Sequence, residues 1–244
     1  MKAGGLDTWY EEHGSGPPFV MLHGDILNAE QFQPQISAFQ HRYRLIIPER
    51  RGHGRTPDLS GDYTYDIFAK DTIALMDALG LKGTILLGHS GGADMALIIA
   101  VSRPDLVSKL VVVSGESAIE LTEQVKARVL SQTAEEFRRF GPRVVESYER
   151  VTPDGVERFP AFFEKIKRLW TTDWRIPDEK LGSISAKTLV MLGDHDFGSV
   201  EEAAVLFRKI PKAQLCVVPG AGHGLMRQKP GVVNNVIASF LEDE

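Results

Sequence analysis

Residues 86–92, Leu86-Leu87-Gly88-His89-Ser90-Gly91-Gly92, carry the strongest local signal in the chain. They lead from a short apolar run into a helix-length segment, with Ser90 at the turn between the two. A tight strand-to-helix turn holds such a serine in a strained backbone conformation, and the flanking glycines lack the Cβ atoms that would collide there. The pattern predicts that the Ser90 hydroxyl projects above a sheet as a nucleophile. A serine in a purely structural glycine-rich turn gives the same pattern, so the prediction depends on partners elsewhere.

Two candidate partners follow Ser90 along the chain. Asp196 ends the segment Gly193-Asp194-His195-Asp196, directly after an apolar run, and His223 lies among the glycines of residues 220–224 after another. Sites in open α/β sheets form beyond the carboxyl ends of the strands, so these residues are expected to meet Ser90. Serine, acid and histidine also occur in the chain order of one known type of catalytic triad. Asp194 is the alternative acid.

Short apolar runs alternate with helix-length segments over most of the chain. The runs are nearly continuous in Val, Ile and Leu, which is typical of strands buried on both faces of a parallel sheet. The alternation predicts an α/β fold, a mostly parallel sheet with helices on both faces and right-handed crossovers. The predicted strands are Phe19–Leu22, Arg44–Pro48, Thr84–Leu87, Leu110–Ser114, Thr188–Leu192 and Leu215–Val218, with Leu6–Glu12 as a weaker antiparallel edge. The predicted helices are Ala29–Phe39, Tyr65–Leu79, Gly91–Ser102, Ser199–Lys209 and Pro230–Leu241.

The alternation stops between Gly115 and Ser185, where only helical spacing is found. One stripe recurs every four residues from Val125 to Phe137, and an aromatic stripe covers residues 159–170, with Pro160 at a first-turn position. We therefore expect amphipathic helices inserted into the α/β domain. The predicted division is a first core segment at 1–116, an insertion at 117–182 and a second core segment at 183–244.

Most of the aromatic stripe is expected to pack on the domain below rather than to contact a substrate. Trp170 and Trp174 fit both roles. The insertion holds equal numbers of basic and acidic residues. It is therefore not expected to bind a membrane through positive charge.

Two further segments extend the pattern around Ser90. Met21-Leu22-His23-Gly24-Asp25 resembles a His-Gly turn, and residues 48–56, PERRGHGRT, resemble an Asp-x-Arg-Gly-x-Gly-x-Ser loop. With these motifs the whole chain resembles the α/β-hydrolase superfamily, in the group with a helical cap. Residues 117–182 would form that cap. The loop departs from the family pattern at Glu49, which replaces Asp, and at Thr56, which replaces Ser. These mild changes concern the geometry of the loop.

The resemblance implies a division of labour among three side chains. Ser90 would be the nucleophile, His223 would accept its proton, and Asp196 would orient the imidazole and stabilise its protonated form. The family's spacing places the acid three residues after the glycine of its segment, which favours Asp196 over Asp194. Activity is then expected to rise with pH as the histidine loses its proton, at about pH 6.5 for an ordinary histidine.

The resemblance also implies that the backbone N–H groups of Asp25 and Gly91 form an oxyanion hole. The Asp25 carboxylate would oppose the negative charge formed there unless it points away, is neutralised or binds a cationic group of the substrate. We expect it to point away, with Arg50, Arg51 or Arg55 as a distant partner. Gly91 is expected to leave room beside the nucleophile, because many relatives have a bulkier residue there.

The implied activity is hydrolysis of a carboxylic ester or related small acyl substrate through an acyl-enzyme. A serine at the turn argues against haloalkane dehalogenase and epoxide hydrolase chemistry, which use a carboxylate nucleophile. Lactonase and carbon–carbon bond hydrolase activities remain alternatives on the same triad. An alternative of a different class is a ligand receptor that keeps the fold without catalysis.

Composition narrows the remaining possibilities. The chain has 244 residues, 28 Lys and Arg against 33 Asp and Glu, and a net charge of −5, which argues against a nucleic-acid partner. Its single cysteine, Cys216, is expected to be a small core residue and allows neither an internal disulfide nor a cysteine-based metal cluster. We expect no cofactor, no metal, no membrane association and a cytoplasmic location, because no metal or nucleotide motif, leader or long apolar run is found. The sequence does not decide between a monomer and a homo-oligomer.

Overall fold

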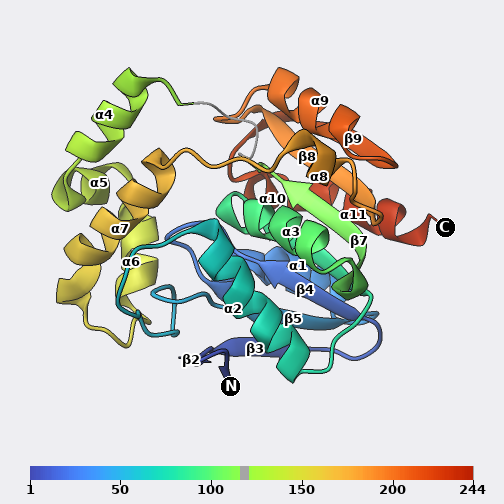
Figure 1. The fold of residues 1–244 in the computed structure, drawn as a ribbon, viewed down its shortest axis with the longest axis horizontal. Helices are drawn as coiled ribbons and strands as arrows, with labels where there is room; N and C mark the ends of the chain where they lie inside the picture. The colour runs from blue at the N-terminus through green and yellow to red at the C-terminus, as the bar shows by residue number, and fades with distance from the viewer. Residues whose placement is uncertain (116–120, 244) are drawn as a thin grey trace.

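The computed structural model describes residues 1–115 and 121–243, and Figure 1 shows an open, twisted sheet with helices on both of its faces. Within these residues the central sheet has seven strands in the order β3-β5-β4-β6-β7-β8-β9. They are β3 (Tyr10–His13), β4 (Pro18–Leu22), β5 (Arg44–Pro48), β6 (Thr84–His89), β7 (Val107–Val113), β8 (Lys187–His195) and β9 (Ala213–Gly222). Neighbouring strands are parallel except for β3 and β5, which are antiparallel. The predicted α/β fold is therefore confirmed.

The N-terminal edge differs from the prediction in one detail. The segment predicted as a single strand, Leu6–Glu12, divides between two elements. β2 (Leu6–Asp7) pairs with β1 (Lys2–Ala3) in a separate hairpin, and only β3 forms the antiparallel edge of the central sheet. The hairpin closes through Gly4 and Gly5 at φ +59° and +86°, a conformation that glycine adopts without strain. This turn folds Leu6 back onto the N-terminus.

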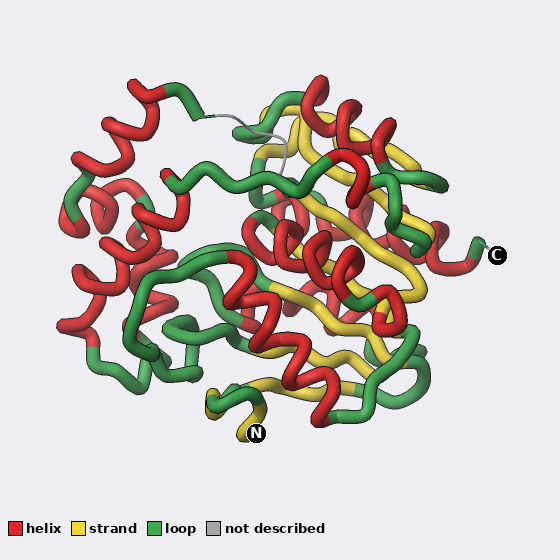
Figure 2. Tube along the Cα trace, viewed as in Figure 1, coloured by secondary structure: helices red, strands yellow, loops and turns green. Residues whose placement is uncertain are grey.

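Successive residues along the central strands point to opposite faces of the sheet, and both faces are buried. In β6, Leu86 packs in one apolar cluster with helices α2 (Tyr65–Ala78) and α3 (Gly91–Ser102). Its neighbour Leu87 packs in a second cluster with α1 (Gln33–Phe39) and α11 (Pro230–Glu242). In the view of Figure 2, α2 and α3 lie in front of the strands, and α1 and α11 lie behind them. Each fully buried leucine stabilises the fold by about 1.5–3 kcal/mol, which explains why the strands read as continuous apolar runs.

The predicted helices of the core are found within one or two residues of their expected ends, with one exception. The segment predicted as a single helix at residues 29–39 starts as a 3₁₀ turn, η1 (Ala29–Phe32), and only then becomes α1, with Pro34 in its first turn. Proline lacks the N–H that a continuous helix would need at that position. The remaining core helices are η2 (Pro104–Leu106), α9 (Val200–Lys209) and α10 (Leu225–Gln228).

Between β7 and β8, the described residues 121–186 form helices and no strand. The helices are α4 (Glu123–Ser131), α5 (Ala134–Phe140), α6 (Pro142–Glu149), η3 (Val156–Arg158), α7 (Phe159–Thr171) and α8 (Asp178–Leu181). In Figure 1, α4 to α7 gather at the left, beside the sheet, whereas α8 lies over it. The predicted boundary between residues 116 and 117 lies outside the described residues, so the division into core and insertion stays a prediction. No helix formed by residues 1–115 and 121–243 is both long and apolar enough to cross a membrane.

The two predicted stripes of the insertion correspond to three helices. The first stripe is divided between α4 and α5, because Thr133 caps the start of a new helix. The Thr133 hydroxyl accepts from the N–H of Glu136, and the Glu136 carboxylate accepts from the N–H of Thr133. The aromatic stripe is the single helix α7, with Pro160 in its first turn. Of its buried aromatic residues, Phe162 packs on His53 and Tyr63 of the core, as expected. Phe159 and Phe163 instead pack on each other and on Phe137 of α5. Lys167 joins α7 to α4, since its Nζ donates to the carbonyl oxygens of Leu130 and Gln132 at 2.9 and 2.8 Å.

Candidate active site

Ser90 occupies the turn between β6 and α3 with φ +54° and ψ −129°. A residue other than glycine rarely adopts this conformation, which costs about 1–3 kcal/mol. Two close approaches hold the turn. A Cβ atom on Gly88 would lie 2.1 Å from the carbonyl oxygen of Gly92, and a Cβ atom on Gly92 would lie 2.2 Å from that of Leu22. Glycine is thus required on both sides of Ser90, because α3 begins in contact with the ends of β6 and β4.

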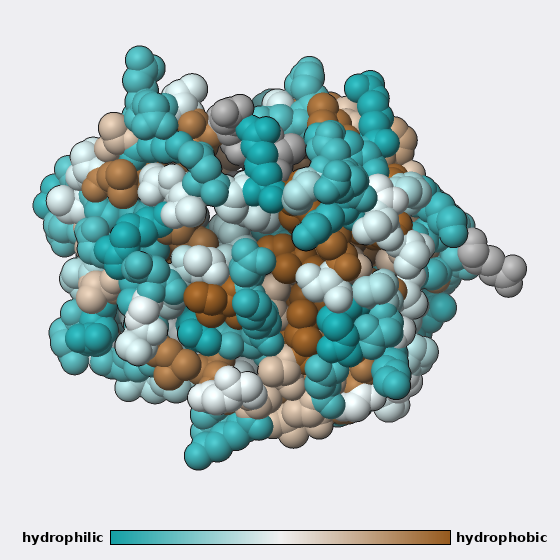
Figure 3. All heavy atoms as spheres, viewed as in Figure 1, coloured by the Kyte–Doolittle hydropathy of each residue, from teal (hydrophilic) through white to brown (hydrophobic). Residues whose placement is uncertain are grey.

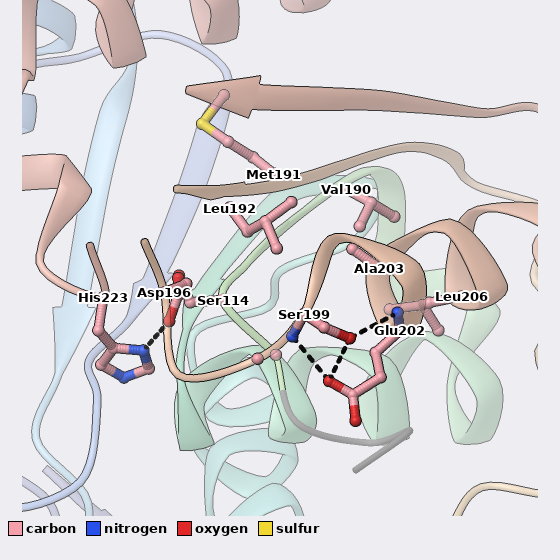
Figure 4. A pocket seen from close by; sticks show the side chains of 12 residues that line it. Ser114, Val190, Met191, Leu192, Asp196, Ser199, Glu202, Ala203, Leu206 and His223 are labelled. Atoms are coloured by element: carbon pink, nitrogen blue, oxygen red, sulfur yellow. Dashed lines mark hydrogen bonds and ion pairs between the residues drawn. The ribbon is translucent and has the colours of Figure 1, made fainter. Parts of the chain in front are cut away.

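Asp196 and His223 meet at the carboxyl ends of β8 and β9, and Figure 4 shows them pointing toward each other. His223 Nδ1 lies 2.7 Å from Asp196 Oδ1. The other carboxylate oxygen, Oδ2, accepts from the Ser114 hydroxyl at 2.6 Å, and Oδ1 also accepts from the N–H of Phe197 at 2.7 Å. The Asp196 side chain is only 2% exposed. The carboxylate is therefore fixed by three donors and presents one oxygen to the imidazole.

Charge as well as geometry distinguishes Asp196. Burial by itself would raise the pKa of Asp196, but the hydrogen bond and charge of His223, together with the bonds from Ser114 and Phe197, outweigh it and lower the pKa below its ordinary value. The group stays ionised at neutral pH and can hold a proton on Nδ1 of His223. The alternative acid, Asp194, accepts from the N–H of Ala221 instead.

Ser114 is a site residue that the sequence analysis did not single out. It follows β7, which lies between β6, the strand before Ser90, and β8, the strand before Asp196. Its position at the end of the strand between these two is the sequence signal that could have identified it. Its backbone has φ +53°, and its N–H donates to the carbonyl oxygen of Met191 at 2.8 Å. In Figure 4 it lies beside Asp196, at a small hollow of about 20 Å³ on the side of α9.

The Asp25 carboxylate corrects our expectation that it points away toward a distant arginine. It lies beside the elbow, 5% exposed, with Oδ1 2.9 Å from Nη1 of Arg50, which is itself 3% exposed. Its Oδ2 accepts from the Tyr65 hydroxyl at 2.9 Å and from Trp170 Nε1 at 2.8 Å. The charge is thus neutralised on the spot, and the carboxylate has three partners from the protein itself. Trp170 also ties α7 of the insertion to the turn after β4.

The other two arginines considered as partners of Asp25 are paired elsewhere. Arg51 forms a two-point ion pair with Asp71, and Arg55 binds Glu49 at 2.7 Å. Glu49 also accepts from the N–H groups of Ala29 and Arg55. Burial raises the pKa of Glu49 above its ordinary value despite these bonds. The longer Glu side chain thus serves the loop as a buried acceptor.

Gly91 does not leave open space beside Ser90, contrary to our expectation. A Cβ atom there would lie 2.5 Å from Oδ1 and 2.7 Å from Oδ2 of Asp25. The space that a larger residue would occupy is filled by that carboxylate. Gly91 and Asp25 therefore form a complementary pair across the turn.

Two buried histidines support the site. His23 Nδ1 lies 2.8 Å from the carbonyl oxygen of Gly24, and its Nε2 accepts from the N–H of Arg50. His89 Nε2 lies 2.8 Å from the carbonyl oxygen of His223, so it holds the backbone of that residue. Burial, followed by the nearby charge of His223, lowers the pKa of His89 to about 4. Both side chains act as neutral hydrogen-bonding groups.

A cavity of about 450 Å³ opens above the elbow, a volume within the usual range for small-molecule sites. Ser90, His223 and Asp25 line its base. Its walls are largely apolar and come from both the core and the insertion: Ile26, Leu27, Leu121, Val125, Val129, Phe137, Phe140, Val144, Trp170 and Phe197. Phe197, exposed on its outer side, stacks on the imidazole of His223 with ring centroids 4.8 Å apart. The arrangement suits a small, mainly apolar molecule held over Ser90.

Comparison with known proteins identifies a family for this chain. Residues 17–177 match the family described as alpha/beta hydrolase fold. The chain belongs to this family. A non-heme haloperoxidase of Rhodococcus erythropolis is 28% identical over 98% of this chain and 97% of its own length. An (E)-2-((N-methylformamido)methylene)succinate hydrolase of Acinetobacter baylyi is 27% identical over 96% and 93%. Among solved structures, the meta-cleavage product hydrolase CumD of Pseudomonas fluorescens IP01 has a TM-score of 0.84 at 22% identity, over 98% of this chain and 95% of its own. The family and these relatives indicate a hydrolase enzyme.

The contact between Gly91 and Asp25 predicts a coupled effect of substitution in this α/β-hydrolase. Gly91→Ala is expected to destabilise the protein by about 1–3 kcal/mol, because the new methyl group overlaps a carboxylate held by Arg50. The same change made in an Asp25→Ala background is expected to cost less. Urea unfolding of the four proteins in this double-mutant cycle measures the coupling.

Gly231→Ala is the matched control, since Gly231 lies in α11 and a Cβ atom there has no neighbour within 4 Å. It is expected to leave stability unchanged or to raise it by about 1 kcal/mol. Equal costs of Gly91→Ala with and without Asp25 would show that the carboxylate is not what requires glycine.

The lowered pKa of His89 predicts how stability depends on pH. Between about pH 4 and 6.5 the unfolded state binds a proton at this histidine that the folded state does not, so its contribution is complete above about pH 6.5 and is lost as the pH falls. From pH 7 to pH 5 the loss amounts to about 2 kcal/mol. His23 and His53, whose pKa values are lowered mainly by burial, add to it in the same direction.

Denaturant unfolding of the wild type and of His89→Asn at several pH values tests this expectation. The variant should lose less stability than the wild type between pH 7 and 5, whereas exposed His41→Asn should behave as the wild type. Identical pH dependence of wild type and His89→Asn would contradict the assignment.

Proposed function

We propose that this protein is a serine hydrolase that cleaves a carboxylic ester or a related small acyl compound through an acyl-enzyme. The observation that carries the proposal is the convergence on one cavity of a strained serine and a histidine bound to a buried carboxylate. Acyl transfer needs a nucleophile, a base and a group that orients the base. Ser90, His223 and Asp196 have the residue types and the surroundings for these roles.

In the proposed first step, His223 takes the proton of the Ser90 hydroxyl as Oγ attacks the acyl carbon. Asp196 stabilises the imidazolium that forms, since its carboxylate already contacts Nδ1 at 2.7 Å. Collapse of the tetrahedral intermediate passes the proton from His223 to the departing alcohol and leaves Ser90 acylated. Water, deprotonated by His223, then attacks the acyl-enzyme and releases the acid.

The negative oxygen of each tetrahedral intermediate would be held by the backbone N–H groups of Gly91 and Asp25. Gly91 is the first residue of α3, where N–H groups lack a partner within the helix and the helix dipole favours negative charge. The turn at Asp25 touches the elbow, since a Cβ atom on Gly24 would lie 3.4 Å from that of Ser90. Arg50 cancels the charge of the Asp25 carboxylate, which would otherwise oppose the oxyanion. The loss of one such donor costs about 3–4 kcal/mol in other hydrolases.

We also propose that residues 117–182 act as a cap over this site. Their support is the contribution of α4 to α7 to the cavity walls and the bond from Trp170 to Asp25. The relatives carry names that refer to several reactions, so lactones and diketones belong in the substrate panel beside simple esters. Multiple turnovers, rather than stoichiometric binding, distinguish an enzyme from a receptor of the same fold.

Covalent labelling tests the nucleophile directly. A fluorophosphonate is expected to add once to the intact protein, because attack by Ser90 Oγ on phosphorus mimics the tetrahedral intermediate. Intact-mass spectrometry should show the adduct in the wild type and in exposed Ser131→Ala, and none in Ser90→Ala. An active wild type that resists labelling would contradict the serine mechanism.

Substitutions at Asp196 and Ser114 test the orienting group. Asp196→Asn should lower kcat by about 10³–10⁴-fold, because the amide no longer holds a proton on Nδ1 or stabilises the imidazolium. Ser114→Ala removes one donor to Asp196 and should lower kcat by about tenfold with little change in KM. Steady-state kinetics with a chromogenic ester at several pH values measures both. A full rate in Asp196→Asn would remove this residue from the mechanism.

A further inference from the structure

A second cavity adjoins the one above Ser90. It has a volume of about 400 Å³ and lies between η1 and α10 of the core and α6 of the insertion. Leu27 and Val144 line both cavities. Leu27 is close to the nucleophile. A Cβ atom placed on Gly24 would lie 3.3 Å from Cδ1 of Leu27 and 3.4 Å from Cβ of Ser90. Leu27 therefore lies both beside Ser90 and in the wall of the second cavity.

The two cavities differ in chemistry. The first is largely apolar, whereas the second is lined by three arginines, Arg143, Arg150 and Arg227, against a single acid, Glu30. Glu30 is already engaged, because it forms ion pairs with Arg150 and with Arg55. The chain as a whole carries a net charge of −5, so this excess of positive charge is local. We call this second cavity the arginine hollow.

Two of the three arginines have no acid partner in the part of the chain that the structure describes. Among residues 1–115 and 121–243, no ion pair or side-chain hydrogen bond is formed by Arg143 or Arg227, in contrast to Arg150. Arg143 lies in the first turn of α6, where the helix dipole disfavours a positive charge, so the helix gains nothing from it. Arg227 lies on α10, four residues after His223. One of these arginines therefore comes from the insertion and the other from the core, and both line the arginine hollow.

We propose that the arginine hollow binds a carboxylate of the substrate, so that the enzyme acts on acyl compounds with an acidic group at the far end of an apolar segment. The inference rests on the proposed hydrolase function and narrows its substrate class. The apolar segment lies in the cavity over Ser90, passes Leu27 and Val144, and places its carboxylate between Arg143 and Arg227. A guanidinium presents paired N–H donors whose spacing matches the two oxygens of a carboxylate.

Matched esters test the proposal by kinetics. The probes are the monomethyl esters of linear dicarboxylic acids of increasing length and the corresponding dimethyl esters, which lack the charge. The wild type is expected to prefer the monoester at one or two chain lengths, through a lower KM. Each of Arg143→Gln and Arg227→Gln should reduce the ratio of kcat/KM for monoester over diester by about three- to fivefold, the size expected for an exposed charge pair, and the double variant by about tenfold. Added salt should reduce the same ratio in the wild type.

Arg139→Gln is the control, because Arg139 is an exposed arginine of α5 outside both cavities that pairs with Glu135. It changes the net charge equally and should leave the ratio of the two rates as in the wild type. The proposal would be overturned, and the hydrolase function left intact, by equal kcat/KM values for monoester and diester that neither Arg143→Gln nor Arg227→Gln changes.

A binding measurement separates this proposal from the proposed reaction. Ser90→Ala, which cannot turn the ester over, is titrated with monomethyl hexanedioate by calorimetry, with and without the Arg143→Gln and Arg227→Gln changes. Binding that weakens about tenfold in the triple variant supports the arginine hollow even if no ester is hydrolysed by the wild type. Failure of the monoester to bind, or binding that is indifferent to both arginines, overturns it. An active wild type that the fluorophosphonate does not label would instead overturn the serine mechanism.

Discussion

The close contact between the start of α3 and the carboxyl ends of β6 and β4 constrains the whole site. It leaves no room for a Cβ atom at Gly88 or Gly92, and it forces Ser90 into a strained conformation. The strain of about 1–3 kcal/mol is offset by burial on both faces of the sheet, where each large apolar side chain contributes a similar amount. Apolar side chains also gather over α3 on the face shown in Figure 3, with polar groups around them. A rigid, doubly covered sheet therefore holds the serine in position.

Charge around the elbow is balanced by buried pairs rather than by solvent. Asp25 and Arg50 lie within the site at 5% and 3% exposure, so each would be costly to bury alone. Together they allow a carboxylate to sit beside the position where a negative oxygen would form. The buried Asp196 carboxylate is instead held by hydrogen bonds from His223, Ser114 and the N–H of Phe197. The carboxylates of Asp25 and Asp196 are thus each held in a fixed position.

The space above the elbow depends on two parts of the chain that are far apart in sequence. The core supplies Ser90, His223 and the turn at Asp25, and the helices between β7 and β8 supply most of the apolar wall. Trp170 connects the two parts, since it lines the cavity and donates to Asp25. In the proposed mechanism, the core supplies the groups that would react at Ser90, whereas the cavity that would hold the substrate depends on both parts of the chain.

Much of this arrangement was predictable from local patterns. Continuous apolar runs identify the parallel strands, and Gly-x-Ser-x-Gly identifies the elbow, because burial and close backbone approach restrict the residues allowed at each position. The placement of Asp196 and His223 beyond successive strands follows from the same rules. Helix ends were less predictable where capping decided them, as at Thr133.

The contacts made by long side chains were decided only by the tertiary structure. The partner of Asp25 could have been any of three nearby arginines, and the packing of the loop after β5 selected Arg50 while Arg51 and Arg55 turned to other acids. Ser114, Tyr65 and Trp170 likewise reach the site from separate elements. Local sequence determined the fold and the candidate site residues, because strands and tight turns depend on near neighbours along the chain. Only the folded structure decided which charges are paired and which face a cavity, because those pairings join residues that the sequence separates.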